Sequence, residues 1–304
     1  MKYDVILVRY GELSLKAPYV RNSFESKLVA NIRNALAFHN ITSTINRDRG
    51  RMYVRTAAIS QSLNILSRTF GVTSFSPALE TEANLDCIGV VAQNIASNNL
   101  SKDTSFALRV TRTGNHPFSS QDVAIRIGDV LQRKTHATVN LNVPDVTIFI
   151  EIRNDNAYLF FEKIKGVSGM PLGTQGTVLA VIDDAYSLLA AWYLMHRGCN
   201  LLIFTAKETT LEEVTSFLNY WFQEPHVIIG RSLDCQGFEE IRSILTKHKC
   251  YAIVTGHALQ EEPARALQEI AFLKSQLPVP VLTPLISMET KTIRKKCTEV
   301  GISL

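Results

Sequence analysis

The residues best placed to do chemistry lie in one turn, between an apolar strand pattern and an apolar helix pattern. Residues 176–206 are typical of a strand, turn, helix and strand, the unit that holds nucleotides in many α/β proteins. Such a turn normally carries glycines, so that backbone N–H groups can approach a phosphate. Here it carries Asp183 and Asp184. The two carboxylates either cap the helix N-terminus or hold Mg²⁺ for a differently bound nucleotide.

A second candidate follows another apolar strand pattern, at Thr255-Gly256-His257. Ligands of open α/β sheets bind at the carboxyl ends of the strands, so His257 is a candidate for the same site. The alternative is a loop histidine satisfied by its polar neighbours. The five cysteines are far apart and lack the spacing of a zinc site, so we expect reduced thiols in the core and no metal centre.

Hydrophobic patterns predict the elements that position these residues. From Val178 onward, apolar strands alternate with helices, which predicts an α/β domain with a doubly wound parallel sheet. The first 75 residues have a β-α-β-β-α pattern, and the middle of the chain is also α+β. Glycine is frequent in residues 166–176, which we interpret as a linker. The predicted domains are therefore 1–75, 76–168 and 169–304.

Charge is distributed unevenly along the chain. The net charge is +4, and the excess of Lys and Arg lies in the first two predicted domains. A basic first half favours an anionic partner, with nucleic acid the first candidate. The sequence has no apolar run long enough to cross a membrane and no pattern of a signal peptide. We therefore expect no membrane partner and a cytoplasmic location.

Three stretches, taken in order, resemble one known family. They are "ILVRYGELSLKAPYVRNSFESKLVANI", then "GRMYV" followed by "FGVTSFSPA", then "VPDV" followed by "EIRNDNAYLFFEKIKGVSGMPLGTQG". Together they resemble the tRNA 4-thiouridine synthetase (ThiI) family, which is also linked to thiamine biosynthesis. The resemblance implies a ferredoxin-like domain, a THUMP domain that binds the tRNA acceptor end, and a PP-loop domain of the adenine nucleotide α-hydrolase type.

The resemblance also implies an activity and partners. In the family, the last domain adenylates a uridine of tRNA with ATP, and a persulfide sulfur then displaces AMP. The implied partners are tRNA, a second copy of the chain in a homodimer, and a sulfur-carrier or catalytic partner protein.

Basic residues of the first two domains become candidates for tRNA contact. The alternative is a solvated charged surface. Phe118, in a loop, either stacks on an unpaired base or packs against a helix. The predicted RNA-binding residues are Arg49, Arg51, Arg109, Arg112, Phe118, Arg126, Arg133, Lys134, Lys163 and Lys165.

The chain departs from the family at the PP-loop. The family motif is Ser-Gly-Gly-X-Asp-Ser, and only Ser187 matches it here. Carboxylates at this turn would occupy backbone donors and repel a polyphosphate. We interpret the surrounding residues as a vestigial nucleotide site and expect no cofactor, with ATP and Mg²⁺ as the alternative. The site comprises Ile182, Asp183, Asp184, Ala185, Tyr186, Ser187, Thr255, Gly256 and His257.

These departures predict a tRNA-binding member of the family without ATP-pyrophosphatase or sulfur-transfer chemistry. No catalytic residue is identified. The family's catalytic cysteine would lie beyond the last helix, and Cys297 is interpreted as a packing residue. The alternatives are an active ATP-dependent tRNA sulfurtransferase with unusual phosphate ligands, or an interaction scaffold that binds no RNA.

Overall fold

The computed structural model describes residues 3–11, 17–48, 50–206, 211–230, 235–259 and 262–303. The chain forms two compact units. The first comprises Met1–Tyr10, His39–Ser67 and Thr73–Gly166, and the second comprises Gly11–Phe38, Arg68–Val72 and Val167–Leu304. In the described ranges, no helix is long and apolar enough to cross a membrane.

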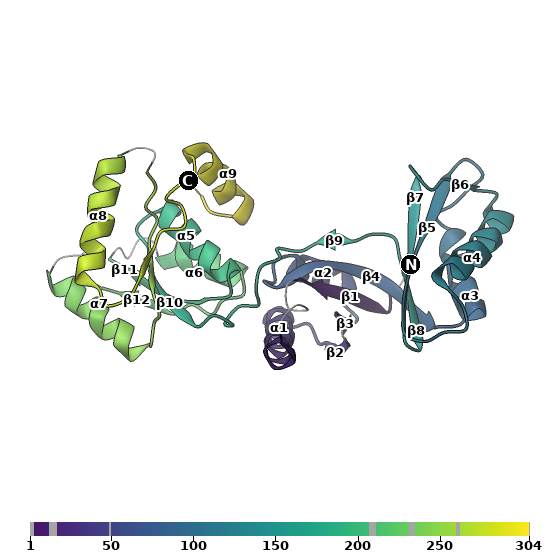
Figure 1. The fold of residues 1–304 in the computed structure, drawn as a ribbon, viewed down its shortest axis with the longest axis horizontal. Helices are drawn as coiled ribbons and strands as arrows, with labels where there is room; N and C mark the ends of the chain where they lie inside the picture. Colours follow the sequence, from purple (N-terminus) through teal and green to yellow (C-terminus); the bar gives the residue numbers. More distant parts are fainter. Residues whose placement is uncertain are drawn as a thin grey trace. The chain divides into compact units, whose positions relative to one another are not determined.

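The first unit is built on a nine-stranded sheet of order β2-β3-β1-β4-β8-β7-β5-β6, with β9 paired to β4 (Figure 1). Its strands are β1 (Val5–Tyr10), β2 (Thr44–Asp48), β3 (Arg51–Arg55), β4 (Val72–Glu82), β5 (Ser105–Thr113), β6 (Thr138–Val139), β7 (Val146–Arg153), β8 (Asn156–Phe160) and β9 (Ile164–Lys165). The helices of this unit are α2 (Ile59–Ser67), α3 (Leu85–Ala96) and α4 (Ser120–Thr135).

Helices α3 and α4 share a core with strands β5, β7 and β8. Ile88, Val123 and Ile150 are among its fully buried members. Ser119 begins α4 with a capping box, in which its side chain and that of Asp122 each accept a backbone N–H of the other residue. The turn between β7 and β8 has Asn154 at a φ of 50°, a conformation that asparagine tolerates better than most residues.

The second unit contains a five-stranded parallel sheet of order β12-β11-β10-β13-β14. Its strands are β10 (Thr177–Val181), β11 (Asn200–Thr205), β12 (Val227–Ile229), β13 (Ile253–Val254) and β14 (Val281–Leu282). Its helices are α1 (Pro18–Phe38), α5 (Ala185–His196), α6 (Leu211–Tyr220), α7 (Cys235–Lys247), α8 (Pro263–Gln276) and α9 (Thr290–Val300). Helix α5 is apolar on most sides because the core surrounds it.

The predicted fold class is confirmed: two α+β parts precede a doubly wound parallel sheet. One difference concerns residues 72–82, which span the predicted boundary between the first two domains. They form the eleven-residue strand β4, which pairs with β8 and β9 and crosses the predicted boundary at residue 75. The sheet of the first two parts is therefore continuous through β4. The exact domain ranges remain a prediction.

Candidate functional site

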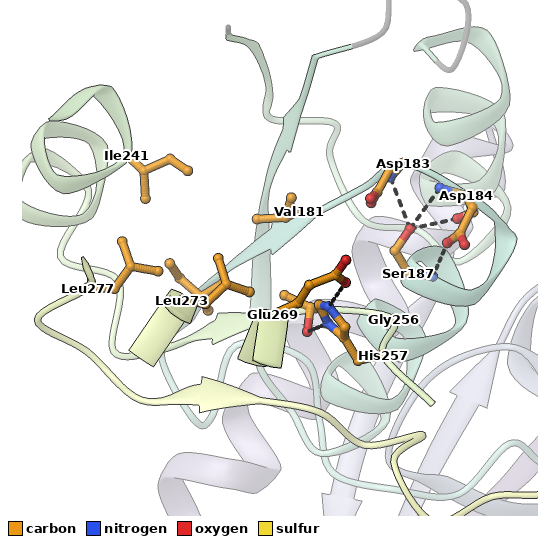
Figure 2. A pocket seen from close by; sticks show the side chains of 12 residues that line it. Val181, Asp183, Asp184, Ser187, Ile241, Gly256, His257, Glu269, Leu273 and Leu277 are labelled. Atoms are coloured by element: carbon orange, nitrogen blue, oxygen red, sulfur yellow. Dashed lines mark hydrogen bonds and ion pairs between the residues drawn. The ribbon is translucent and has the colours of Figure 1, made fainter. Parts of the chain in front are cut away.

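The first turn of α5 is closed by its own side chains. Strand β10 ends at Val181, and Asp184 is the N-cap of α5. The Ser187 N–H donates to Asp184 Oδ1 at 2.8 Å, and Ser187 Oγ donates to the Asp184 carbonyl at 2.7 Å. The backbone N–H groups of Asp183 and Asp184 both donate to Ser187 Oγ at 3.0 Å (Figure 2). This is the geometry that the capping interpretation requires.

Gly256 lies directly against this turn. A Cβ atom built on Gly256 would be 2.3 Å from the Ser187 backbone nitrogen and 2.7 Å from Ser187 Cα. Real Cβ atoms do not approach so closely, so any side chain here would force the backbone of one segment away from the other. The segment that follows β13 therefore packs its backbone directly against the first turn of α5.

His257 connects this segment to helix α8. Its Nδ1 lies 2.8 Å from Thr255 Oγ1, and its Nε2 lies 3.1 Å from Glu269 Oε2. Arg265 Nε donates to the other Glu269 oxygen at 2.9 Å. The hydrogen bond from Arg265 is the largest influence that lowers the pKa of Glu269, and His257 adds to it. Both imidazole nitrogens of His257 thus have polar neighbours, which is the satisfied loop histidine of the alternative interpretation.

These segments enclose a cavity of about 190 Å³. Pockets for drug-sized ligands are typically about 300–1,000 Å³, so this one is small. Six of the nine predicted nucleotide-site residues line it: Asp183, Asp184, Ser187, Thr255, Gly256 and His257. The other three, Ile182, Ala185 and Tyr186, pack with the apolar core around α5. Sequence reasoning missed the apolar floor of the cavity, which includes Ile241, Leu273 and Leu277, since these residues lie on or directly after later helices.

Cys297 on α9 is fully buried in the core that surrounds α5. Burial raises the pKa of its thiol to about 11, and the nearby Asp184 carboxylate adds to the effect. A thiol needs a lowered pKa to act as a nucleophile near neutral pH, so this environment suits packing. Among the residues that the structure describes, no group of three or more His, Cys, Asp or Glu side chains could hold a metal ion.

Several predicted RNA-binding residues have partners within the first unit. Arg126 forms an ion pair with Asp86 at 2.6 Å, and Arg112 donates to the Gly114 carbonyl. Arg109 donates to the Leu141 carbonyl. Phe118 is half-buried against the core of α3 and α4 and stacks on His116 at a ring distance of 5.3 Å.

Other predicted RNA-binding residues remain on the surface. Arg133 and Lys134 are exposed in the last turn of α4, where cations also suit the helix dipole. Lys165 is exposed on β9. Arg49 lies outside the described residues.

Two of the predicted RNA-binding residues, Arg51 and Lys163, meet in one cluster of cations. Arg51, Arg9 and Arg153 contact the Glu151 carboxylate at 2.6, 3.3 and 3.4 Å. Glu151 is only 4% exposed, and burial acts to raise its pKa, but the three arginines outweigh this and lower it. We name Arg9, Arg51, Arg153 and Lys163 the Glu151 cation cluster.

Lys163 completes that cluster at its exposed side. Its Nζ lies 4.7 Å from the centre of the Phe149 ring. Desolvation is the largest influence that lowers the pKa of Lys163, and the positive charge of Arg9 lowers this pKa further. Sequence reasoning missed Arg9 and Arg153 because the cluster joins residues from β1, β3 and β7, more than 140 positions apart at the extremes. No local spacing signals such a meeting.

The chain thus has two α+β parts on one sheet, followed by a domain with a parallel sheet, which is the order of a THUMP-containing α/β protein. Residues 5–76 match the ThiI ferredoxin-like domain, residues 82–162 match the THUMP domain, and residues 238–303 match the thiamine biosynthesis protein (ThiI) domain. A probable tRNA sulfurtransferase of Methanobrevibacter smithii is 31% identical over 338 residues, which cover 99% of this chain and 87% of the relative. A second, from Methanosarcina acetivorans, is 32% identical and covers 98% and 81%. The chain belongs to the ThiI family of tRNA sulfurtransferases.

Two solved structures share the fold of this chain. The structure of PH1313 from Pyrococcus horikoshii Ot3 has a TM-score of 0.86 at 28% identity and covers 98% of this chain and 100% of that chain. A 4-thiouridine synthetase, solved as an RNA complex with bound ATP, has a TM-score of 0.78 at 18% identity and covers 98% and 85%. The second likeness shows that the fold is shared.

Proposed function

We propose that this protein binds tRNA through its first unit and no longer performs ATP-dependent chemistry in its last domain. The observation that carries the proposal is the closed turn at the start of α5, where Ser187 and Asp184 satisfy backbone N–H groups that a phosphate would need. The activity named for the relatives requires more than the fold, because function depends on the site.

The domain matches support a difference between the two halves. The ferredoxin-like and THUMP matches cover most of the first unit. The match to the ThiI domain begins at residue 238 and leaves residues 177–237 outside it. The closed turn lies within that unmatched segment.

Electrostatics at the turn also oppose a polyphosphate. Asp183 and Asp184 are both exposed at the cavity. Each carboxylate within about 4 Å of a phosphate charge would cost about 1 kcal/mol even at the dielectric constant of water, and more where water is excluded. Two such costs reduce affinity by about thirtyfold.

The first unit offers the opposite charge. In the Glu151 cation cluster, three arginines contact one buried carboxylate, Lys163 lies within their electrostatic influence, and Asp48 lies 4.0 Å from Arg153. The cluster therefore keeps a net positive charge, which favours phosphodiester groups. Lys163 of this cluster and Lys165, two residues further along the chain, are both exposed and can therefore reach a phosphate.

The test is tRNA affinity of the full chain at two salt concentrations. We expect the affinity to fall about tenfold or more between 50 and 200 mM salt, because phosphate contacts release counterions. The Lys163→Ala/Lys165→Ala variant should weaken binding and flatten the salt dependence, by about one unit of logarithmic slope for each lysine that pairs with a phosphate. The matched control is Lys247→Ala/Lys249→Ala, two exposed lysines at the end of α7.

Binding that is insensitive to salt, or an equal effect of the two double variants, would contradict the proposal. Absence of any tRNA affinity would favour the alternative of a scaffold that binds no RNA. The same proposal places the protein in the cytoplasm as a homodimer, with a partner protein that supplies sulfur or the missing catalytic groups. Sedimentation of the full chain with and without tRNA tests the dimer.

A further inference from the structure

A second cavity in the second unit lies between helix α1 and the loop that leads into β10. Its volume is about 400 Å³. Its lining includes Ser23, Ser26, Lys27, Ala30, Gly173 and Thr174. The two loop residues precede β10, whereas the α5 turn follows that strand. The cavity is therefore at the opposite end of β10 from the predicted nucleotide site.

Hydrogen bonds hold the loop wall of this cavity in place. Asn31 Nδ2 on α1 donates to the Leu172 carbonyl at 3.1 Å. The Thr174 N–H and the Thr174 hydroxyl both donate to the Pro171 carbonyl, at 3.2 and 2.8 Å. The α1 wall presents residues spaced by three and four positions, which share one face of a helix. Both walls are thus built from ordered backbone.

Lys27 brings its ammonium group against the loop. A Cβ atom built on Gly173 would be 2.6 Å from Lys27 Cε and 2.9 Å from Lys27 Nζ. The φ of Gly173 is 83°, a conformation that glycine adopts readily. A glycine at this position therefore leaves the space that the end of the lysine side chain occupies. The ammonium group lies at the cavity wall as a result.

No carboxylate balances this ammonium group in the part of the chain that the structure describes, where Lys27 forms no ion pair. Glu25, two positions earlier, is 7% exposed and lies 3.9 Å from Arg21. Residues two positions apart do not face each other on a helix, so Glu25 belongs to a different face of α1. The Ser23 hydroxyl likewise has no hydrogen-bond partner in the described ranges.

This set of groups favours a phosphate as the ligand. An ammonium group has three hydrogen-bond donors and no acceptor, and a serine hydroxyl can donate as well. Lysine and serine side chains are among the groups that contact phosphate oxygens in nucleic-acid complexes. The described lining contains no Asp or Glu that would repel an anion. In this respect the cavity differs from the α5 turn, where two aspartates stand.

We propose that this cavity binds a phosphate group, with Lys27 and Ser23 as donors and the loop around Gly173 as the facing wall. The phosphate belongs either to the backbone of the tRNA or to a free phosphate compound, and the same donors recognise both. The inference goes beyond the proposed function, because it assigns an anion site to the second unit at a distance from the α5 turn.

Methyl NMR of the full chain locates the site. The protein is labelled at its alanine and threonine methyl groups and titrated with inorganic phosphate, with chloride keeping the ionic strength constant. We expect Ala30 and Thr174 to shift, with half-saturation near about 30 mM for so few hydrogen bonds. At that affinity, millimolar Mg-ATP leaves the cavity largely unoccupied. Thr255, which lines the cavity beside α5, should not shift.

Variants test the donors. Lys27→Gln removes the charge and should weaken phosphate binding at least about fivefold, because a hydrogen bond to a charged group is lost. Ser23→Ala should weaken it about threefold, and alanine preserves the helix. The matched control is Lys274→Gln, at an exposed lysine of α8 outside the cavity lining, which should leave the affinity unchanged.

Titration with tRNA distinguishes the two sources of phosphate. If the phosphate belongs to tRNA, tRNA itself shifts Ala30 and Thr174 and blocks the response to inorganic phosphate. Lys27→Gln then lowers the logarithmic salt slope of tRNA binding by about one unit. If the ligand is a free phosphate compound, the response to inorganic phosphate persists in the tRNA complex.

The failure of this inference is distinguishable from that of the proposed function. Unchanged Ala30 and Thr174 resonances in both titrations, or equal effects of Lys27→Gln and Lys274→Gln, would overturn the phosphate site and leave the proposed function intact. A phosphate-dependent shift of Thr255 would instead contradict the proposed loss of phosphate binding at the α5 turn.

Discussion

At the start of α5, Ser187 uses its side chain for the protein's own backbone. Its hydroxyl accepts two N–H groups and donates to one carbonyl, and its own N–H donates to Asp184. Ser187 is the one position of the turn that matches the family motif. The match at this one position is therefore not by itself evidence for a phosphate site, because the same hydroxyl can hold a turn closed.

Replacing Asp184 tests the cap. Asp184→Ala should lower the free energy of unfolding of the last domain by about 1 kcal/mol, since the Ser187 N–H then has no side-chain acceptor. Asp184→Asn is the matched control, because asparagine caps helices equally well, and it should stay within about 0.5 kcal/mol of the wild type. Urea unfolding followed by tryptophan fluorescence measures this selectively, because Trp192 and Trp221 both lie in this core. Equal destabilisation in both variants would argue against the cap.

Cysteine alkylation tests whether Cys297 is a packing residue. Burial raises the pKa values of Cys199, Cys250 and Cys297, the last to about 11. The thiolate fraction of these residues is therefore low at about pH 8 and rises only at higher pH. With iodoacetamide at that pH, we expect the folded protein to be labelled at the half-exposed Cys87 before the buried Cys199, Cys250 and Cys297. Mass spectrometry reads the sites, and urea should equalise them. Rapid labelling of folded Cys297 would refute its packing role.

At the scale of elements, Glu151 ties together β1, β3 and β7 through three arginines. Glu151→Gln would leave these cations without a buried counter-charge. Breaking a buried charge pair in this way typically costs about 3–5 kcal/mol. Because Arg51 is partly exposed, we expect a destabilisation of about 3 kcal/mol at neutral pH. Hydrogen exchange of peptides from β7 measures it, with Glu162→Gln as the control at an exposed carboxylate.

Acid should remove the same contribution. The folded-state pKa of Glu151 is lowered from 4.5, so its stabilisation is complete above the unfolded-state value and is lost as the pH falls through the folded-state value. The difference between wild type and Glu151→Gln should therefore shrink below about pH 4. A difference that stays constant from neutral pH down to about pH 3 would show that the carboxylate charge is not responsible.

Most elements were predictable because their signals are local. The alternation of strand and helix after Val178 predicts the parallel sheet. The sequence did not predict strand β4, because Pro77 and the serines interrupt its apolar pattern. Its pairing with β8 and β9 also depends on residues that are distant in the sequence. The Glu151 cation cluster and the apolar cavity floor were missed for the same reason.

At the scale of the whole molecule, the chain has the family fold, and we propose that one site differs. The relatives match nearly its full length, and the PH1313 structure matches it closely in fold. The sequence resemblance predicted this architecture. It could not predict the cavity beside α5, because the lining of this cavity depends on how α7 and α8 pack beside the sheet.

The most direct test of the account is calorimetric titration of Mg-ATP into the full chain, with and without tRNA. We predict no binding heat up to millimolar ATP in either case, together with salt-dependent binding of tRNA. Micromolar ATP binding that is lost in an Asp183→Asn/Asp184→Asn variant would contradict the account, because the aspartates would then hold a magnesium nucleotide.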